Sequence, residues 1–200
     1  MSRILLCFFP VSLVLAGEWP QASGPNGNFV GTGDSPAAFS VSKNEAVRWR
    51  VKLPSTGQGT PVVSGGRVFV TSHEEITEDS QTGSSILAMC FDANTGKELW
   101  RRKIGGSRKT DLSSLFSDNT AASPVTDGKR VVFVNVGGTV KCFDYEGEEL
   151  WSHVWTPFGR HHARAHEPIL HDGKVILMHA PRYDLPVSAT TKSGSHPLGR

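Results

Sequence analysis

Short apolar segments alternate with polar turns along most of the chain, a pattern typical of β-strands rather than helices. Such segments lie at residues 60–63, 67–71, 86–92 and 97–104, and again at 123–126, 130–136, 139–144 and 148–151. In each set, a glycine-containing turn separates the first two segments and another separates the last two. Four short strands joined in this way are the content of one propeller blade. The pattern therefore predicts an all-β fold.

One stretch recurs with its landmark residues in register. Cys90 to Trp100 consists of a strand ending in Phe-Asp, a polar turn closed by glycine, and a second strand that ends on tryptophan. Cys142 to Trp151 repeats this plan, and the two tryptophans are 51 residues apart. Trp49 lies another 51 residues before Trp100. A period of about 50 residues with a fixed tryptophan indicates propeller-type repeats.

The repeats divide the chain into several parts. We expect a strand at 46–53, a blade at 58–104, a blade at 119–155, a partial blade at 166–180 and an irregular tail at 181–200. The predicted fold class is an incomplete β-propeller of four-stranded antiparallel blades, with about two blades plus the start of a third. Because propellers close with about 4–8 blades, we expect a longer protein with further C-terminal blades, the last of which pairs with the Trp49 strand.

The lengths of the predicted connections differ between the two ends of each blade. Tight turns join the first strand to the second and the third to the fourth. The long inserts, at 73–85, 105–118 and 152–166, all fall at the opposite end. We call the two ends the tight-turn end and the loop end. Because binding sites concentrate on loops displayed by a rigid scaffold, the loop end is the predicted functional face.

The first residues have the pattern of a secretory signal peptide. Arg3 precedes an apolar run of 13 residues, Ile4 to Ala16, and small residues follow. The run is short for a bilayer span, and the remaining alternative is a buried element of the fold. We expect a signal peptide at 1–17, an extended lead-in at 18–45, and an exported protein, periplasmic or extracellular, without a transmembrane segment after signal removal.

The net charge limits the classes of partner, and the cysteines bear on whether a disulfide forms. The net charge of +2 gives no broad basic surface, so nucleic acid is not an expected partner. Cys90 and Cys142 raise the question of a disulfide in an exported protein. They occupy equivalent positions of successive repeats, which are too far apart for the bond. Two small buried side chains are the favoured interpretation.

The stretch Asp92 to Trp100, together with Thr60-Pro-Val-Val and Arg67-Val-Phe-Val, resembles the pyrroloquinoline-quinone-like β-propeller repeat family. The resemblance covers about residues 46–180. It implies that Trp100 and Trp151 dock each blade against its neighbour. The family includes quinone-dependent dehydrogenases, and it also includes a non-catalytic lipoprotein that helps to assemble outer-membrane β-barrels. The chain is more similar to the latter type.

The sequence lacks two motifs of the quinone-dependent dehydrogenases, and their absence determines what we expect of catalysis. The sequence has no adjacent cysteine pair and no CxxCH haem motif. We therefore expect no catalytic, cofactor-binding or metal residue. The alternative is the N-terminal part of a quinone-dependent alcohol or sugar dehydrogenase, which would use the quinone with calcium. The carboxylates Glu74, Glu75, Glu78 and Asp79 are better explained as a solvated loop than as a cation site.

The candidate residues fall into two groups. The first marks the structural repeat and comprises Trp49, Asp92, Gly96, Trp100, Asp144, Gly147 and Trp151. The second is a loop cluster of Arg160, His161, His162, Arg164 and His166. For the loop cluster, metal binding, contact with an anion or peptide, and a plain surface loop all remain open. The sequence thus predicts a non-catalytic scaffold that presents its loop end to a protein or peptide.

Overall fold

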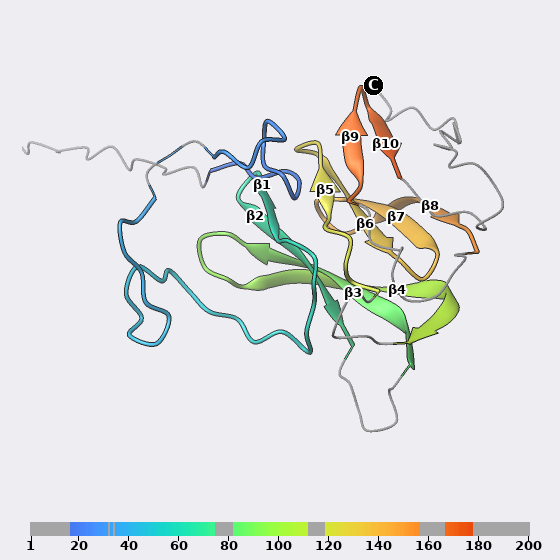
Figure 1. The fold of residues 1–200 in the computed structure, drawn as a ribbon, viewed down its shortest axis with the longest axis horizontal. Coiled ribbons are helices and arrows are strands. Elements are labelled where there is room, and N and C mark those ends of the chain that lie inside the picture. Colours follow the sequence, from blue (N-terminus) through green and yellow to red (C-terminus); the bar gives the residue numbers. More distant parts are fainter. Residues whose placement is uncertain are drawn as a thin grey trace, which may run out of the picture.

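The computed structural model describes residues 17–31, 33, 35–74, 82–111, 119–156 and 167–177. All ten regular elements in these ranges are β-strands (Figure 1). They are β1 (Val62–Ser64), β2 (Arg67–His73), β3 (Thr82–Asp92), β4 (Glu98–Asp111), β5 (Val125–Thr126), β6 (Arg130–Asn135), β7 (Thr139–Asp144), β8 (Glu149–Val154), β9 (Ile169–His171) and β10 (Lys174–Ile176). Within the described part of the chain, no helix is long and apolar enough to cross a membrane.

The strands form two four-stranded antiparallel sheets and one two-stranded sheet. Their orders are β1-β2-β3-β4, β5-β6-β7-β8 and β10-β9, so strands adjacent in sequence are adjacent in each sheet. β5 contacts both β1 and β9, which makes these three the inner strands of successive units. The predicted all-β fold of four-stranded antiparallel blades is confirmed. We call the sheets blade 1, blade 2 and the third hairpin.

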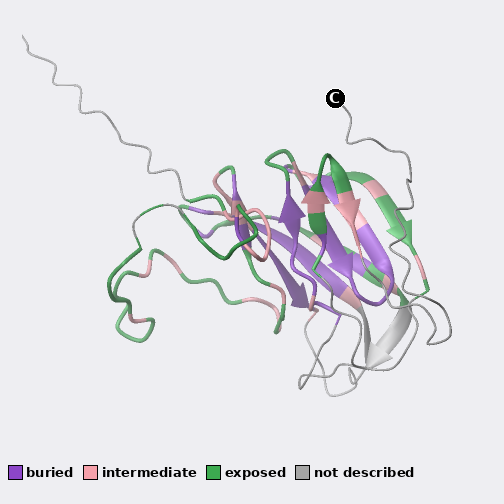
Figure 2. Cartoon of the chain, turned by 45° about the horizontal axis from the view of Figure 1, so that its top comes forward, coloured by how far each residue is buried: buried purple, intermediate pink, exposed green. Residues whose placement is uncertain are grey.

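The strands are nearly continuous apolar runs because both faces of each blade are covered. On β2, Phe69 faces blade 2, whereas Val70 faces the opposite side of blade 1. On β6, Phe133 faces blade 1, and Val132 faces the third hairpin. Figure 2 shows the resulting concentration of buried residues in the strands of the two sheets. The main core therefore lies between blades 1 and 2.

The Cys-Phe-Asp motif marks a repeated irregularity of the third strand. In blade 1 the register between β3 and β4 shifts between Cys90 and Phe91. In blade 2 the register between β7 and β8 shifts at the same place, between Cys142 and Phe143. An irregularity of this kind bends the strand and increases its twist. The motif thus shapes the end of the third strand before the turn.

Blade 1 extends further into the predicted inserts than the hydrophobic pattern indicates. β3 begins at Thr82 and β4 continues to Asp111, and these two residues pair. Part of the inserts predicted at 73–85 and 105–118 is therefore strand. The added segments consist only of polar residues and glycine, so hydrophobic periodicity could not detect them. Backbone pairing holds them in the sheet, because it does not require apolar side chains.

The segment predicted as a strand at 46–53 is not a strand in the structure. Residues 46–53 belong to no strand, because no described strand lies beside them to form a ladder, and the segment begins with Ala46 at a φ of +52°. The side chains alternate over residues 47–50, where Val47 and Trp49 are half-buried and Arg48 and Arg50 are exposed. Val51 breaks this alternation, because it is 38% exposed. The periodicity thus indicated the buried and exposed faces of residues 47–50. A neighbouring strand that would pair with them is not among the described residues.

The lead-in, predicted as an extended segment at 18–45, takes part in two isolated β-bridges. Trp19 forms an antiparallel bridge with Val63 of β1, and Ser40 forms another with Glu45. Trp19, Ser40 and Glu45 themselves lie outside the named strands. Most of the predicted signal peptide, residues 1–16, and the predicted tail at 181–200 lie outside the described residues.

Candidate functional site

Trp100 on β4 docks on the turn between β7 and β8 of blade 2. Its indole Nε1 donates a hydrogen bond of 2.9 Å to the carbonyl oxygen of Tyr145. Gly147 in this turn has a φ of +85°, and a Cβ placed there would lie 2.8 Å from the indole ring. Both the backbone conformation and the close approach therefore require glycine. Trp100 itself is 7% exposed.

Trp49 makes the same contact with the turn of blade 1. Its Nε1 donates a hydrogen bond of 2.9 Å to the carbonyl oxygen of Ala93. Gly96 has a φ of +73°, and a Cβ there would lie 2.7 Å from the indole. Arg48 adds a 3.0 Å hydrogen bond from its guanidinium to the Asn94 side chain. The docking motif is thus present twice in the described residues.

An aspartate holds each of these turns. The Asp92 carboxylate accepts hydrogen bonds from the Asn94 and Thr95 amides and from the Thr95 hydroxyl. The hydrogen bonds from Thr95 lower the pKa of Asp92 below its ordinary value. Asp144 accepts hydrogen bonds from the Glu146 and Glu148 amides. The two aspartates fix the turn backbone on which the tryptophan docks.

Trp151 occupies the equivalent position on β8. It pairs with Cys142 in the ladder, as Trp100 pairs with Cys90. Trp151 is half-buried and packs against the cluster of blade 2 that Leu170 of the third hairpin also covers. The described residues of the third hairpin end at 177, so a docking turn for Trp151 is not among them.

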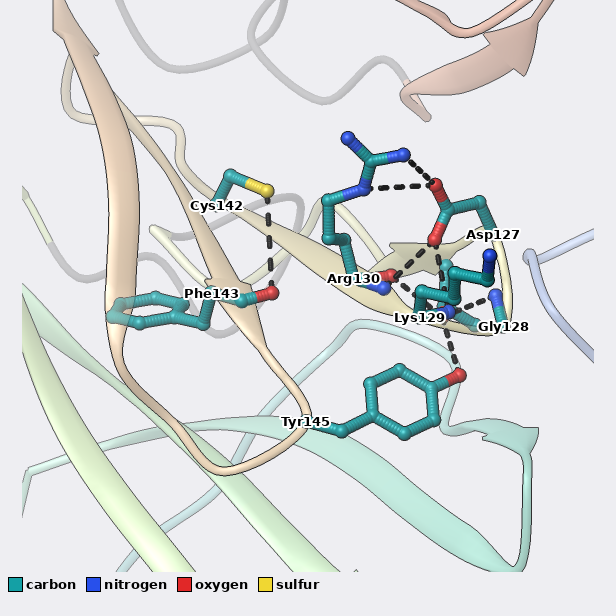
Figure 3. A network of polar contacts seen from close by, with 8 residues as sticks. Asp127, Gly128, Lys129, Arg130, Cys142, Phe143 and Tyr145 are labelled. Atoms are coloured by element: carbon teal, nitrogen blue, oxygen red, sulfur yellow. Dashed lines mark hydrogen bonds and ion pairs between the residues drawn. The ribbon is translucent and has the colours of Figure 1, made fainter. Parts of the chain in front are cut away.

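Aromatic side chains fill the tight-turn end of the space between the blades. Phe69 and Tyr145 have ring centroids 5.1 Å apart, and the Tyr145 hydroxyl shares a 2.7 Å hydrogen bond with Thr126 (Figure 3). The guanidinium of Arg67 lies over the Tyr145 ring and pairs with Glu146 at 3.0 Å. Tyr145 therefore closes this end of the interface, a role that the sequence analysis missed.

The turn at residues 127–130, beside Tyr145, is stabilised by hydrogen bonds and an ion pair within the turn. Asp127 accepts hydrogen bonds from the backbone amides of Lys129 and Arg130, and its carboxylate forms an ion pair of 3.0 Å with the Arg130 guanidinium (Figure 3). These contacts satisfy the turn locally.

Polar side chains occupy the loop end of the same interior. The buried polar residues there are Thr71, Ser72, His73, Asn119, Thr120, Ser123, Asn135 and Thr139, whereas Ser64 and Thr126 lie at the tight-turn end. The Thr71 hydroxyl donates to the carbonyl of Thr120 across the interface. Since buried polar groups require partners, this end of the interface has a fixed hydrogen-bonded arrangement.

A relay of hydrogen bonds connects the three inner strands at the loop end. Each inner strand begins after a residue that precedes proline: Thr60, Ser123 and Glu167. The Thr60 amide donates to the Ser123 hydroxyl oxygen at 2.8 Å. The Ser123 amide and hydroxyl donate to the Glu167 carboxylate at 2.7 and 2.9 Å. The recurrence of a polar residue before proline is visible in the sequence and could have indicated this relay.

The predicted loop cluster, Arg160, His161, His162, Arg164 and His166, lies outside the described residues. Glu167, which follows it directly, is described and anchored to Ser123. Of the predicted acidic loop, Glu74 is described and forms a 2.8 Å ion pair with Lys103. This residue is therefore engaged within blade 1.

The two cysteines are free thiols buried on successive blades. Burial raises the pKa of Cys90 to about 12 and that of Cys142 to about 12. The neutral thiol thus dominates at physiological pH, and it packs as a small apolar group. In the described residues these thiols do not form a vicinal pair.

The described residues contain no cluster of potential metal ligands. Across 17–74, 82–111, 119–156 and 167–177, with residues 32 and 34 left out, no three histidine, cysteine, aspartate or glutamate side chains converge as metal ligands would.

A family model described as the outer membrane protein assembly factor BamB matches residues 82–195. Among solved structures, BamB from Moraxella catarrhalis is 18% identical with a TM-score of 0.43, and the match covers 66% of this chain and 33% of that chain. A europium-containing methanol dehydrogenase is 19% identical with a TM-score of 0.37, and the match covers 57% of this chain and 20% of that chain.

The match thus spans about a third of the length of that BamB. None of the curated proteins matches the sequence. The family model nevertheless extends over more than half of the residues, and it includes the repeat with Trp100 and Trp151. The chain therefore belongs to the BamB-type family of pyrroloquinoline-quinone-like β-propeller repeat proteins.

Proposed function

We propose that the chain is part of an exported, non-catalytic β-propeller scaffold that binds a protein or peptide at its loop end. The observation that carries this proposal is the difference between the two ends of the blades. At the tight-turn end, glycine turns, docked tryptophans and Tyr145 fill the space between the blades. At the loop end, the three long connections leave the strands.

The packing between the blades makes this pair of blades a rigid support. Trp100 crosses from blade 1 to blade 2, and Asn135 donates from blade 2 to the Ile104 carbonyl of blade 1 at 2.9 Å. Loops attached to such a support can present a fixed surface to a partner. The membership of the BamB family supports a protein partner, because BamB is named as an assembly factor of outer membrane proteins.

Export is the localisation that this role requires. The apolar run from Ile4 to Ala16 behind Arg3 supports it, since this arrangement is that of a signal peptide. N-terminal sequencing of the protein recovered from a secreting bacterial host tests this part. A mature chain that begins near Glu18 is expected, and retention of Met1 would contradict export.

Site-specific photo-crosslinking tests the binding face. The probe is an unfolded outer-membrane β-barrel polypeptide, diluted from urea, and a photoreactive amino acid replaces one residue at a time. Thr60 is exposed at the loop end, and Arg160 lies in the loop cluster; Lys129 is the exposed control at the tight-turn end. Crosslinks from Thr60 and Arg160, but not from Lys129, are expected. Equal crosslinking from all three, or none, would contradict the proposal.

A quinone titration separates this proposal from the dehydrogenase alternative. The full chain is mixed with pyrroloquinoline quinone and calcium, and tryptophan fluorescence and dye reduction with an alcohol or sugar are recorded. We expect neither saturable quenching nor dye reduction. Quinone-dependent dye reduction would overturn the non-catalytic assignment without affecting the crosslinking result.

A further inference from the structure

The inner edge of blade 1 carries an additional piece of chain at its tight-turn end. The Trp19 amide donates to the Val63 carbonyl at 2.7 Å, and the Val63 amide donates to the Trp19 carbonyl at 2.9 Å. Val63 lies on β1, whose other edge pairs with β2. Trp19 therefore continues the sheet by one bridge on the side that faces the other inner strands.

The same segment reaches blade 2. The Pro20 carbonyl accepts a 2.9 Å hydrogen bond from the Thr126 amide of β5. One residue before Trp19, the Glu18 carboxylate accepts a 3.1 Å hydrogen bond from the Gly65 amide in the β1–β2 turn. Three successive residues thus bind two blades, almost entirely through backbone groups. Figure 1 shows this blue segment beside β1 and β5.

The indole of Trp19 organises the rest of the segment, residues 18–31, which we call the strap. A Cβ on Gly24, which has a φ of +79°, would lie 3.0 Å from the indole, and one on Gly31 would lie 3.4 Å away. Gly24 also donates its amide to the Gln21 carbonyl at 3.0 Å. The strap therefore folds around its own tryptophan and docks through the short run of Glu18, Trp19 and Pro20.

The connection from the strap to blade 1 makes this docking separable from the blades. Residues 35–46 between them are exposed apart from Ser40, which is half-buried. Such a segment can release the strap without disturbing the packed sheets, because local opening requires only the loss of the contacts of the strap. An extended peptide offers the same backbone groups as Glu18 to Pro20.

We propose that the inner edge of β1 and the Thr126 amide form a peptide-binding edge, and that the strap occupies it as an exchangeable resident ligand. The edge takes an extended peptide that contains an aromatic residue followed by proline. While the strap is in place, it closes the tight-turn end of the inner strands, and only the loop end is open to partners. The proposal is independent of which partner the loop end binds.

Residue-resolved amide exchange of the full chain by NMR tests the proposal. In Trp19→Ala, we expect the Val63 and Thr126 amides to exchange at least about tenfold faster, as the loss of a protecting hydrogen bond predicts. The amides of β6 should keep their rates. Phe29→Ala is the matched control, since Phe29 is an aromatic residue of the same strap that is 74% exposed. Unchanged exchange of Val63 and Thr126 in Trp19→Ala would overturn the proposal.

Exchangeability is tested by adding the strap in trans. A capped peptide with the sequence of residues 17–23 is added to Trp19→Ala, and protection of the Val63 and Thr126 amides is expected to return. The same peptide with alanine in place of tryptophan should have no effect. A failure of the first peptide to restore protection would show that the strap is a fixed part of the fold.

A measurement on the unmodified chain covers the case in which Trp19→Ala does not fold. The Val63 and Thr126 amides are then followed at rising urea concentrations below the unfolding transition. We expect both to exchange through one shared opening that is insensitive to urea, whereas the β6 amides follow global unfolding. If Val63 and Thr126 instead exchange with β6, the strap opens only when the chain unfolds, and the proposal is wrong.

Discussion

Trp49 and Trp100 make the same local contact in two different settings. Each indole donates a 2.9 Å hydrogen bond to a turn carbonyl and lies against a glycine of positive φ. Trp100 belongs to β4, which pairs with β3 along its length, and it is 7% exposed. Trp49 is half-buried and belongs to no strand. The docking contact therefore does not depend on the ladder behind the tryptophan.

The difference lies in what surrounds the two rings. Trp100 has Phe69, Phe133 and Phe143 within 6.1 Å, centroid to centroid, whereas Trp49 packs on the outer turn of blade 1. Burial of aromatic surface is the main source of stability in such clusters. The repeat motif therefore specifies where a tryptophan docks, and the neighbouring blade determines how much the contact contributes to stability.

Removal of Trp100 should produce the largest effect. We expect Trp100→Ala to lower the free energy of unfolding by about 3–5 kcal/mol, the usual cost of truncating a buried aromatic residue. Urea unfolding followed by far-UV circular dichroism measures it. Leu99→Ala is the control, because Leu99 is the adjacent residue and is 43% exposed. Equal losses for the two variants would mean that the aromatic cluster does not stabilise the interface.

A methyl group on the turn glycine should have the next largest effect. In Gly147→Ala the added Cβ meets the Trp100 ring at 2.8 Å and the residue must keep a positive φ, so we expect a loss of about 1–3 kcal/mol. Gly96→Ala adds the same group against Trp49, which can move outward, and should cost less. The same urea experiment compares the two. A larger loss for Gly96→Ala would reverse the ranking of the two junctions.

Truncation of Trp49 should have a smaller, more local effect. We expect Trp49→Ala to reduce the free energy of unfolding by about 1–2 kcal/mol, as for partial burial of one aromatic side chain. Amide exchange should accelerate in the 93–97 turn and remain unchanged in β6. A loss as large as that of Trp100→Ala would show that the extended segment at 46–53 belongs to the cooperative core.

The smallest effect concerns pH at the Trp49 junction. The folded-state pKa of Asp92 is lowered, mainly by its hydrogen bonds from Thr95. A lowered folded pKa stabilises the fold above the unfolded pKa, about 3.9, and this contribution is lost as the pH falls through the folded pKa. The melting temperature of Asp92→Asn should therefore lie below that of the unmodified chain at pH 6, and the difference should shrink as the pH falls below the unfolded pKa and through the folded pKa. A constant difference would contradict the role of the carboxylate charge.

Much of the blade architecture could be predicted from the sequence because the repeat is local. The apolar segments, the glycine turns and the period of the tryptophans depend on residues close in the chain, and the strands of both blades follow them. The free cysteines illustrate the same point, since Cys90 and Cys142 sit at matching ladder positions opposite Trp100 and Trp151.

What the sequence did not reveal depends on contacts between distant residues. The bridge of Trp19 to Val63 and the hydrogen bond of Tyr145 to Thr126 leave no periodic signal, because each occurs once among the described residues. The polar ends of β3 and β4 are held by backbone pairing, which hydrophobicity does not register. The segment predicted as a strand at 46–53 illustrates the opposite case: its side chains alternate over 47–50, but a strand also needs a neighbouring strand, and none is described beside it.

The relay through Thr60, Ser123 and Glu167 implies a polarity in how the propeller is completed. Each donor in the relay pairs with an acceptor that follows it in the chain. Ser123 follows Thr60 by 63 residues, and Glu167 follows Ser123 by 44 residues. An unmade hydrogen bond at such a site costs about 1–3 kcal/mol when the group is buried. A blade thus gains its last hydrogen bonds at the loop end only when its successor is in place, and completion in the N-to-C direction is the order that the relay favours.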